Sequence, residues 1–329
     1  MWVAGDCFQD EEMRRAVVIN GGRLGICGFS GTKGDVIEIE FFYDFFDELL
    51  SLFSLSSAGR PLVEVIQDDW AIFSTDEIGR KFLDYVCNDL APTLNSHSLV
   101  EYSDGIISRI SIWDDLKNSV MNDYRFFSKH DSLDSFSSLL PQATLKKNTV
   151  LYRARILPKD KTTLKRTEMG CPPVSLATAG RANPPGIPYL YLCGDEATTF
   201  YEVRSVHLDK LCVGRFLVQD ELDIVDFNAK ISLYLAFDGS DLADVVASKK
   251  IIDAIRQDMS RPMRRYDSEV EYVPTQMICE YCKYKGAHGI CFDSTLHEGG
   301  KNYVLFDGNS AKCTKVFYRE VKEIDIKVE

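Results

Sequence analysis

A proline-rich loop followed by a strand is the first place in this sequence where binding chemistry is expected. Residues 180–188 read Gly-Arg-Ala-Asn-Pro-Pro-Gly-Ile-Pro, and the apolar run 189–193 follows directly. Three prolines and two glycines restrict such a loop, and rigid loops beside strands commonly carry binding groups. Arg181 and Asn183 are therefore candidate binding residues. The alternative is that both only hold their own loop through hydrogen bonds to the backbone.

Charged side chains near this strand could act on an anion bound beside it. Asp195 is a suitable N-cap for a helix over 196–204, which places the carboxylate of Glu202 near the end of the preceding strand. Upstream, Arg153 and Arg155 stand two residues apart and share one face of a strand, where their forked donors suit a phosphate. The pattern fits a phosphate clamp beside a functional carboxylate. It equally fits a solvated glutamate and ordinary surface arginines.

The elements that must position these residues belong to a second half with short alternating or apolar runs. Such runs predict strands at 150–155, 189–193, 211–218 and 289–292, and at the alternating residues Ile324, Ile326 and Val328. Helical spacing predicts helices at 196–204, at 241–259 and from Pro274 onward. We therefore predict an α+β domain over 141–329.

The first half has a helical pattern. Apolar residues recur at steps of three and four at Phe42, Phe45, Phe46, Leu49, Leu50 and Phe53. Further helices are expected at 76–91, after Thr75 or Asp76 and before Pro92, and at 113–127, with short strands near 62–73. A Ser-rich stretch at 128–150 marks the boundary. Residues 36–140 are thus predicted to form a mainly helical domain.

Residues 1–35 are predicted to form a small separate element. Six glycines lie between positions 21 and 34, which is too dense for a helix or a regular strand. The predicted organisation is therefore a Gly-rich element at 1–35, an acidic helical domain at 36–140 and an α+β domain at 141–329.

Charge and composition exclude several classes of function. The net charge is −12, and residues 1–140 hold 11 basic and 24 acidic side chains against 27 and 26 in residues 141–329. The acidic half would repel phosphate backbones, which argues against nucleic acid as a partner. No apolar run reaches the roughly 18 residues of a membrane helix, and no secretory signal is recognisable. We expect a cytoplasmic protein whose ten cysteines are free thiols.

Six sequence blocks in order give the second half a family resemblance. They are Leu-Tyr-Arg-Ala-Arg at 151–155, Met169 to Pro173, the 180–191 segment, Glu202-Val203-Arg204, Tyr272 to Gln276, and Gly289-Ile290 leading to Ser294 and to 302–306. Residues 141–310 thereby resemble the RES domain. The resemblance implies an ADP-ribosyltransferase-like fold and consumption of NAD+, by hydrolysis, by phosphorolysis or by transfer of ADP-ribose to a protein. Many RES proteins are bacterial growth-inhibiting toxins.

The resemblance also implies roles for individual residues. Glu202 would stabilise the positive charge that develops on the ribose when nicotinamide departs. Arg153 and Arg181 would hold the pyrophosphate, and Tyr191 would position the nicotinamide end. Ser294 would donate a hydrogen bond to the substrate, which Arg155 and Asn183 would also help to bind. A nucleophilic serine is disfavoured, because no histidine motif stands beside Ser294.

The first element resembles a zinc-binding piece that precedes RES domains in longer members. Cys7 and Cys27 are present, but Ala4 and Ser30 stand at the partner positions, and a closed zinc site needs four ligands. We therefore expect no zinc and no cofactor beyond NAD+ as substrate. The metal-like spacing of Cys279, Cys282, His288 and Cys291 is read as core thiols and an ordinary histidine.

The sequence therefore predicts an enzyme that degrades NAD+, acting as a toxin or a defence effector. The alternatives are a protein ADP-ribosyltransferase and a non-catalytic module that senses NAD+ or ADP-ribose. An inhibitory antitoxin or regulatory protein and self-association are the partners considered. The residues leave open whether the acceptor is water, phosphate or a protein side chain.

Overall fold

The chain divides into two compact units that interleave along the sequence. The computed structural model describes residues 1–126, 140–237, 239–261 and 269–323. One unit comprises Met1–Ser111 and Lys230–Lys250, and the other comprises Ile112–Ala229 and Ile251–Glu329. The units differ from the predicted ranges 1–35, 36–140 and 141–329, because the Gly-rich start shares one hydrophobic core with the following helices and with Leu233 and Leu242. Part of the predicted boundary, 128–139, lies outside the described residues, as do Ile324, Ile326 and Val328.

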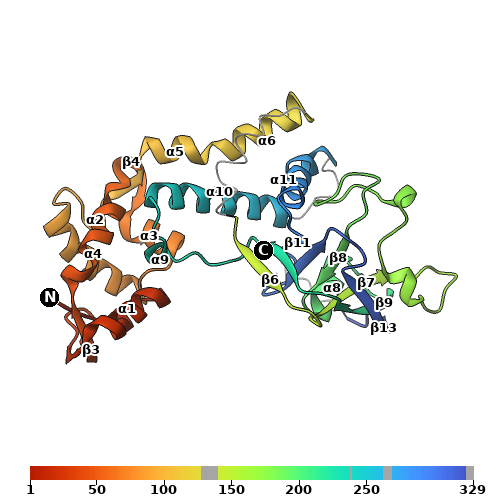
Figure 1. Cartoon of the computed structure of the whole chain (residues 1–329), viewed down its shortest axis with the longest axis horizontal. Coiled ribbons are helices and arrows are strands. Elements are labelled where there is room, and N and C mark those ends of the chain that lie inside the picture. The colour runs from red at the N-terminus through yellow and green to blue at the C-terminus, as the bar shows by residue number, and fades with distance from the viewer. Residues whose placement is uncertain (127–139, 238, 262–268, 324–329) are drawn as a thin grey trace. The chain divides into compact units, whose positions relative to one another are not determined.

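The first unit is mainly helical (Figure 1). Its helices are α1 (Glu11–Gly21), α2 (Tyr43–Ser51), α3 (Leu62–Trp70), α4 (Asp76–Leu90), α5 (Asp104–Ile110), α9 (Leu233–Phe237) and the first part of α10 (Leu242–Ser260). Its strands are β1 (Trp2–Ala4), β2 (Arg23–Ile26) and β3 (Lys33–Glu38) in one sheet, and β4 (Phe53–Pro61) with β5 (Leu99–Tyr102) in another. The predicted helices at the Phe42 stripe and at 76–91 are confirmed, and the Thr75 hydroxyl accepts the N–H of Ile78.

Two local predictions for the first unit are wrong. The segment near 62–73 forms the helix α3 and not strands, because its apolar residues 62, 63, 65, 66 and 70 make one buried helical face. This burial overrides the strand preference of the β-branched residues. The Gly-rich segment also contains regular structure. Helix α1 ends where the glycines begin, at Gly22 with φ +55°, and β2 and β3 pair with Gly25 opposite Gly34.

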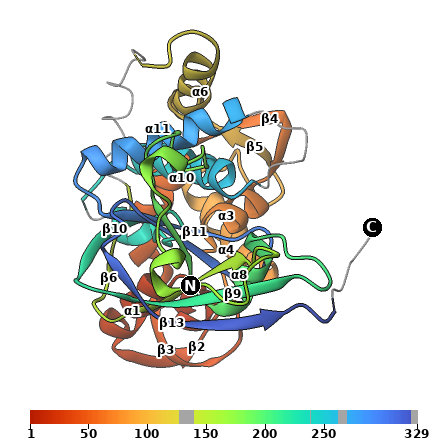
Figure 2. The same ribbon diagram turned by 90° about the vertical axis from the view of Figure 1, so that its right-hand side faces the viewer.

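The second unit is built on an eight-stranded sheet, so the predicted α+β class is confirmed. The strand order is β13-β9-β7-β8-β12-β11-β10-β6, and only the β10–β11 pair is parallel. The strands are β6 (Gln142–Leu145), β7 (Val150–Ile156), β8 (Leu190–Cys193), β9 (Lys210–Val218), β10 (Leu222–Asp226), β11 (Gly289–Asp293), β12 (Lys301–Leu305) and β13 (Ala311–Glu320). Figure 2 shows β9 and β13 side by side at one edge of the sheet.

The remaining helices of the second unit are α6 (Ile112–Asn122), α8 (Glu196–Glu202), α11 (Val273–Tyr284) and the last part of α10. Helix α11 lies against β11, and Pro274 occupies its first turn as predicted. Buried residues on one face of the sheet, such as Leu151, Leu190 and Phe216, form one hydrophobic core. All ten cysteines are free thiols. In the described part of the chain, no helix has the length and apolar character needed to cross a membrane.

Candidate active site

Glu202 is the last residue of the short helix α8, which follows strand β8 directly. The carboxylate of Asp195 caps this helix by accepting the N–H of Thr198 at 2.8 Å, as the sequence predicts. The helix stops after Glu202, and Arg204 adopts a left-handed conformation with φ +50°. The strand, the cap and the early stop together fix the place of the Glu202 side chain.

Two hydrogen bonds hold one oxygen of the Glu202 carboxylate. Ser294 Oγ donates to Glu202 Oε1 at 2.6 Å, and Asn302 Nδ2 donates to the same oxygen at 2.8 Å. Hydrogen bonds to an ionised acceptor are among the stronger ones in proteins. Within the described residues, the second oxygen accepts no hydrogen bond. Glu202 is therefore fixed in place and keeps one oxygen for a ligand.

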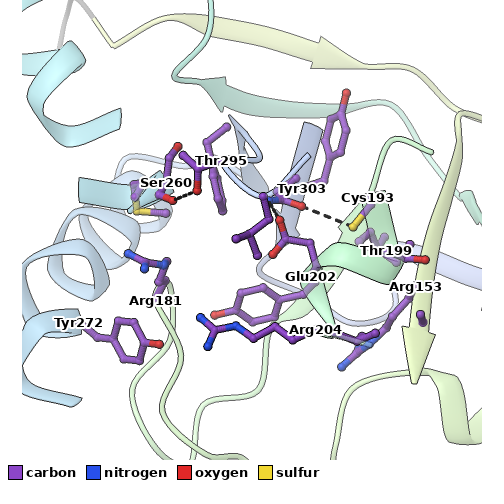
Figure 3. A pocket seen from close by; sticks show the side chains of 18 residues that line it. Arg153, Arg181, Cys193, Thr199, Glu202, Arg204, Ser260, Tyr272, Thr295 and Tyr303 are labelled. Atoms are coloured by element: carbon purple, nitrogen blue, oxygen red, sulfur yellow. Dashed lines mark hydrogen bonds between the residues drawn. The ribbon is translucent and has the colours of Figure 1, made fainter. Parts of the chain in front are cut away.

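A cavity of about 550 Å³ lies beside this carboxylate. Its charged lining residues are Glu202 and three arginines, Arg153, Arg181 and Arg204, and Tyr191 and Tyr272 add aromatic surface. Figure 3 shows these arginines, carried by β7, by the 180–188 loop and by the residues after α8, around the Glu202 side chain. A small ligand in this cavity meets an excess of positive charge.

Three arginines of this region, Arg153, Arg155 and Arg181, are partly buried, and none of them forms an ion pair with a described residue. Arg153 Nη1 and Arg155 Nη2 both donate to the carbonyl of Gly170, at 3.2 and 2.7 Å. Burial lowers the pKa of Arg153 to about 10, and it also lowers the pKa values of Arg155 and Arg181. Among the described residues, no carboxylate lies within ion-pair distance of these three guanidinium groups. Because they stay cationic at neutral pH, they favour an anionic ligand.

The proline-rich loop is tied to the strand that follows it. The hydroxyl of Tyr191 donates to Asn183 Oδ1 at 2.6 Å and accepts the N–H of Ala182 at 3.1 Å. Asn183 Nδ2 in turn donates to the carbonyls of Thr178 and Pro184. Asn183 thus holds its own loop through hydrogen bonds to backbone carbonyls, which is the alternative to a binding role given above. Arg181 lies at the cavity, where its guanidinium donates to the carbonyl of Asp258 at 2.7 Å and stands 5.4 Å from the Tyr272 ring centroid.

The structure brings together four of the seven residues selected from the sequence. Arg153, Tyr191, Arg181 and Glu202 line the same cavity. The other three do not line it: Ser294 holds the Glu202 carboxylate, Asn183 contacts its own loop, and Arg155 lines a neighbouring cavity of about 490 Å³ that Arg153 also lines.

Sequence reasoning did not select Arg204, Asn302 and Tyr272 as site residues. Arg204 stands two residues after Glu202, but its left-handed backbone, which directs the side chain, has no sequence signal. Asn302 is brought to the site by the pairing of β12 with β8, where it stands opposite Cys193. Asn302 could therefore be selected from the sequence only if the pairing of these two strands were known.

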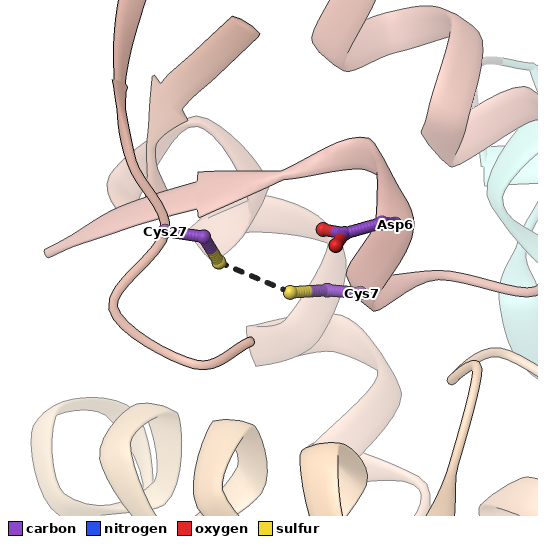
Figure 4. Close-up of side chains that lie close together, drawn as sticks. All are labelled: Asp6, Cys7 and Cys27. Atoms are coloured by element: carbon purple, nitrogen blue, oxygen red, sulfur yellow. Dashed lines mark hydrogen bonds between the residues drawn. The ribbon is translucent and has the colours of Figure 1, made fainter. Parts of the chain in front are cut away.

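A second cluster of chemically active side chains lies in the first unit. Asp6, Cys7 and Cys27 place their ligand atoms within 4.8 Å of one another, and they are the one such group of three in the described residues (Figure 4). The two sulfur atoms are 3.2 Å apart. Cys27 Sγ also faces the N–H groups of Ala4, Phe29 and Ser30 at 3.4 to 3.5 Å.

These residues do not fit the closed four-ligand zinc site of the related element. Ala4 has no side-chain ligand atom, and the Ser30 hydroxyl donates to Asp6. Two thiols and one carboxylate remain where a structural zinc ion takes four ligands. The second spacing pattern is also accounted for, since Cys279, Cys282 and Cys291 are buried in the core.

The fold and the cavity define a mixed α+β protein with a fixed carboxylate beside a pocket lined by arginines. The family model of the RES domain matches residues 150–326, which is slightly more than half of the chain. The chain therefore belongs to the RES domain family.

Among solved structures, the chain is similar to a crystal structure of the M. tuberculosis MbcT–MbcA toxin–antitoxin complex. The sequences are 12% identical, the TM-score is 0.32, and the match covers 67% of this chain and 93% of the other. No curated protein matches the sequence.

Proposed function

We propose that this protein is an enzyme that degrades NAD+ by cleaving the bond between nicotinamide and ribose. The observation that carries the proposal is the Glu202 carboxylate, held on one oxygen by Ser294 and Asn302, beside a cavity with three arginines. Membership of the RES family supports NAD+ as the substrate. An anionic pyrophosphate matches the arginines, and a developing cation matches the carboxylate.

The chemistry requires charge stabilisation more than proton transfer. Nicotinamide is bound to the ribose through a cationic ring nitrogen, so it leaves as a neutral molecule and the positive charge passes to the ribose. Glu202 stabilises this charge when its free oxygen faces the anomeric carbon. Arg153 and Arg181 bind the pyrophosphate, which holds the ribose in place, and Tyr191 keeps the adjacent loop in position.

The decisive experiment compares three purified proteins with NAD+, with and without inorganic phosphate. They are the wild type, Glu202→Gln and Glu221→Gln; Glu221 is an exposed glutamate between β9 and β10 and does not line the cavity. The wild type and Glu221→Gln should release nicotinamide, and Glu202→Gln should be slower by about a thousandfold or more. Free ADP-ribose marks hydrolysis, and ADP-ribose-1″-phosphate marks phosphorolysis.

The other outcomes separate the alternatives. Full activity in a folded Glu202→Gln protein contradicts the assignment. NAD+ bound without nicotinamide release favours a sensing module. Release that requires an added protein, with ADP-ribose attached to it, favours a protein ADP-ribosyltransferase.

We further propose that the enzyme is a cytoplasmic toxin or defence effector. Depletion of NAD+ stops growth, so expression of the wild type should arrest bacterial growth and lower cellular NAD+, whereas Glu202→Gln at the same protein level should not. An inhibitory partner protein would then be needed by a cell that carries the gene. Growth arrest by both proteins would argue against NAD+ depletion as the cause.

A further inference from the structure

The two oxygens of the Glu202 carboxylate are in unequal surroundings. Oε1 accepts from Ser294 and Asn302, whereas Oε2 accepts no hydrogen bond from the described residues. Oε1 is held in this way only if the side-chain amide of Asn302 directs its nitrogen, and not its oxygen, toward the carboxylate. An amide rotated by 180° would place two acceptors against each other.

A cysteine fixes the orientation of that amide. Asn302 is buried, and it stands opposite Cys193 in the register of β12 and β8. The Cys193 thiol donates to Asn302 Oδ1 at 3.4 Å. Burial and the nearby charge of Glu202 raise the pKa of Cys193, so the sulfur keeps its proton at neutral pH and remains a donor. With Oδ1 bound in this way, Nδ2 faces Glu202.

We propose that Asn302 and Cys193 form a positioning chain for Glu202, in which the thiol orients the amide and the amide holds the carboxylate. This inference rests on the proposed function, because it gives Asn302 and Cys193 a role in the cleavage of NAD+ by way of Glu202. Neither residue would act on the substrate by proton transfer. Their role is to keep Oε2 directed at the developing ribosyl cation.

The first test uses a matched pair of variants at Cys193. Cys193→Ser keeps a donor for Asn302 Oδ1, whereas Cys193→Ala removes it. Cys193→Ser should retain kcat within about threefold of the wild type, and Cys193→Ala should lose about tenfold, with KM for NAD+ nearly unchanged in both. Asn302→Ala should lose kcat by about ten- to a hundredfold, since it removes a hydrogen bond to a charged group.

Equal kcat values for Cys193→Ser and Cys193→Ala would overturn the role of the thiol. A large increase in KM with unchanged kcat in Asn302→Ala would assign Asn302 to substrate binding and overturn the positioning role. Thermal melts of each variant show whether it is folded before its kinetics are compared.

The second test does not depend on catalysis. Asn302→Asp places a second carboxylate against Glu202, so the pair shares a proton at low pH and repels after losing it. The folded variant then holds a proton that the unfolded chain releases. Its free energy of unfolding, compared with that of the wild type, should therefore fall as pH rises from 5 to 8. The double variant Glu202→Gln/Asn302→Asp should remove this pH dependence.

Among the described residues, the charged groups near the pair include the cavity arginines Arg153, Arg181 and Arg204, together with Asp195 before α8. They are unchanged in every variant, so the double variant isolates the contact between positions 202 and 302. An Asn302→Asp protein whose stability follows the wild type at all pH values would overturn the contact. If the contact is found but the wild type releases no nicotinamide, the proposed function fails and the contact stands.

Discussion

The Cys27 cluster of the first unit and the Glu202 site of the second are both held by several hydrogen-bond donors, but only Glu202 lies beside a cavity that could take a ligand. In each, several donors converge on one atom: three N–H groups and a thiol on Cys27 Sγ, and a hydroxyl and an amide on Glu202 Oε1. Both sulfur atoms of the cluster belong to buried cysteines, whereas Glu202 keeps an oxygen beside a large cavity. A reactive side chain can act on a ligand only where one of its atoms is not already used by the protein and faces a cavity.

After Glu202→Gln, the largest effect is expected from Arg153, which shares the cavity with Glu202. Arg153→Ala should lower kcat/KM for NAD+ by about a hundredfold, because it removes from the pocket a guanidinium that forms no ion pair with a described residue. Arg155→Ala removes a guanidinium bound to the same carbonyl but lining the neighbouring cavity, and it should cost about tenfold or less. Steady-state kinetics of both variants test this order. An equal loss in both would show that the two cavities act as one binding site.

A smaller effect is expected from the hydroxyl that joins strand β8 to the proline-rich loop. Tyr191→Phe removes the hydrogen bonds to Asn183 and Ala182, so it should lower stability by about 1 kcal/mol and kcat/KM by severalfold. The control is Tyr201→Phe, whose hydroxyl is exposed and forms no hydrogen bond in the described residues. Denaturant unfolding and kinetics measure both quantities. Unchanged kinetics in Tyr191→Phe would show that the loop does not position the substrate.

How far the sequence predicts this molecule depends on how local each signal is. The strand at Arg153 and the Asp195 cap before Glu202 are set by neighbouring residues, and both were predictable. The segment 62–70 was misread, because its helical face is set by burial and not by the preference of its β-branched residues.

Long-range pairing explains what the sequence did not reveal about the site. The contact of Asn302 with Cys193 joins residues 109 positions apart, and it depends on the order of strands in the sheet. Arg153 and Arg155 share a strand face and a carbonyl, and both line the cavity of about 490 Å³, yet of the two only Arg153 also lines the cavity beside Glu202. Spacing along the chain cannot distinguish two such residues.

The Cys27 cluster should affect stability in a pH-dependent way and leave catalysis unchanged. The hydrogen bond from Cys7, together with Ser30 and the N–H donors, lowers the pKa of Cys27 to about 4, against the opposing effect of burial. The unfolded thiol titrates near about 8.5, so the stabilisation by the thiolate grows as pH rises toward that value and is lost as pH falls through the lowered pKa of Cys27. Cys27→Ser should therefore cost more free energy of unfolding at pH 8 than at pH 5.

Cys87→Ser is the matched control for this prediction. Burial raises the pKa of Cys87 to about 11, so Cys87 is a neutral thiol in the folded protein at both pH values. The contribution of Cys87 to the free energy of unfolding should therefore be the same at pH 5 and pH 8. Denaturant titrations at the two pH values test both variants. A cost of Cys27→Ser that does not change with pH would show that Cys27 is a neutral thiol, and a loss of NAD+ cleavage would connect the cluster to the active site.

The smallest effect is expected from removal of metal. Because Ala4 and Ser30 leave the cluster without a full ligand set, a strong chelator should change neither the melting temperature nor the rate of NAD+ cleavage. Elemental analysis of the purified protein should find less than one zinc ion per chain. A stoichiometric zinc ion that is lost in Cys7→Ser would contradict the prediction.

The burial of Arg153, which forms no ion pair with a described residue, carries an energetic cost that a bound anion would offset. A lowered pKa for Arg153 means that the folded state carries this buried charge at a disadvantage relative to water. An anion that binds the folded state alone raises its stability by about 2.7 kcal/mol at a hundred times its dissociation constant. If the cavity binds NAD+ as proposed, the concentration of NAD+ also sets the stability of the folded protein, which becomes easier to unfold as it consumes this ligand.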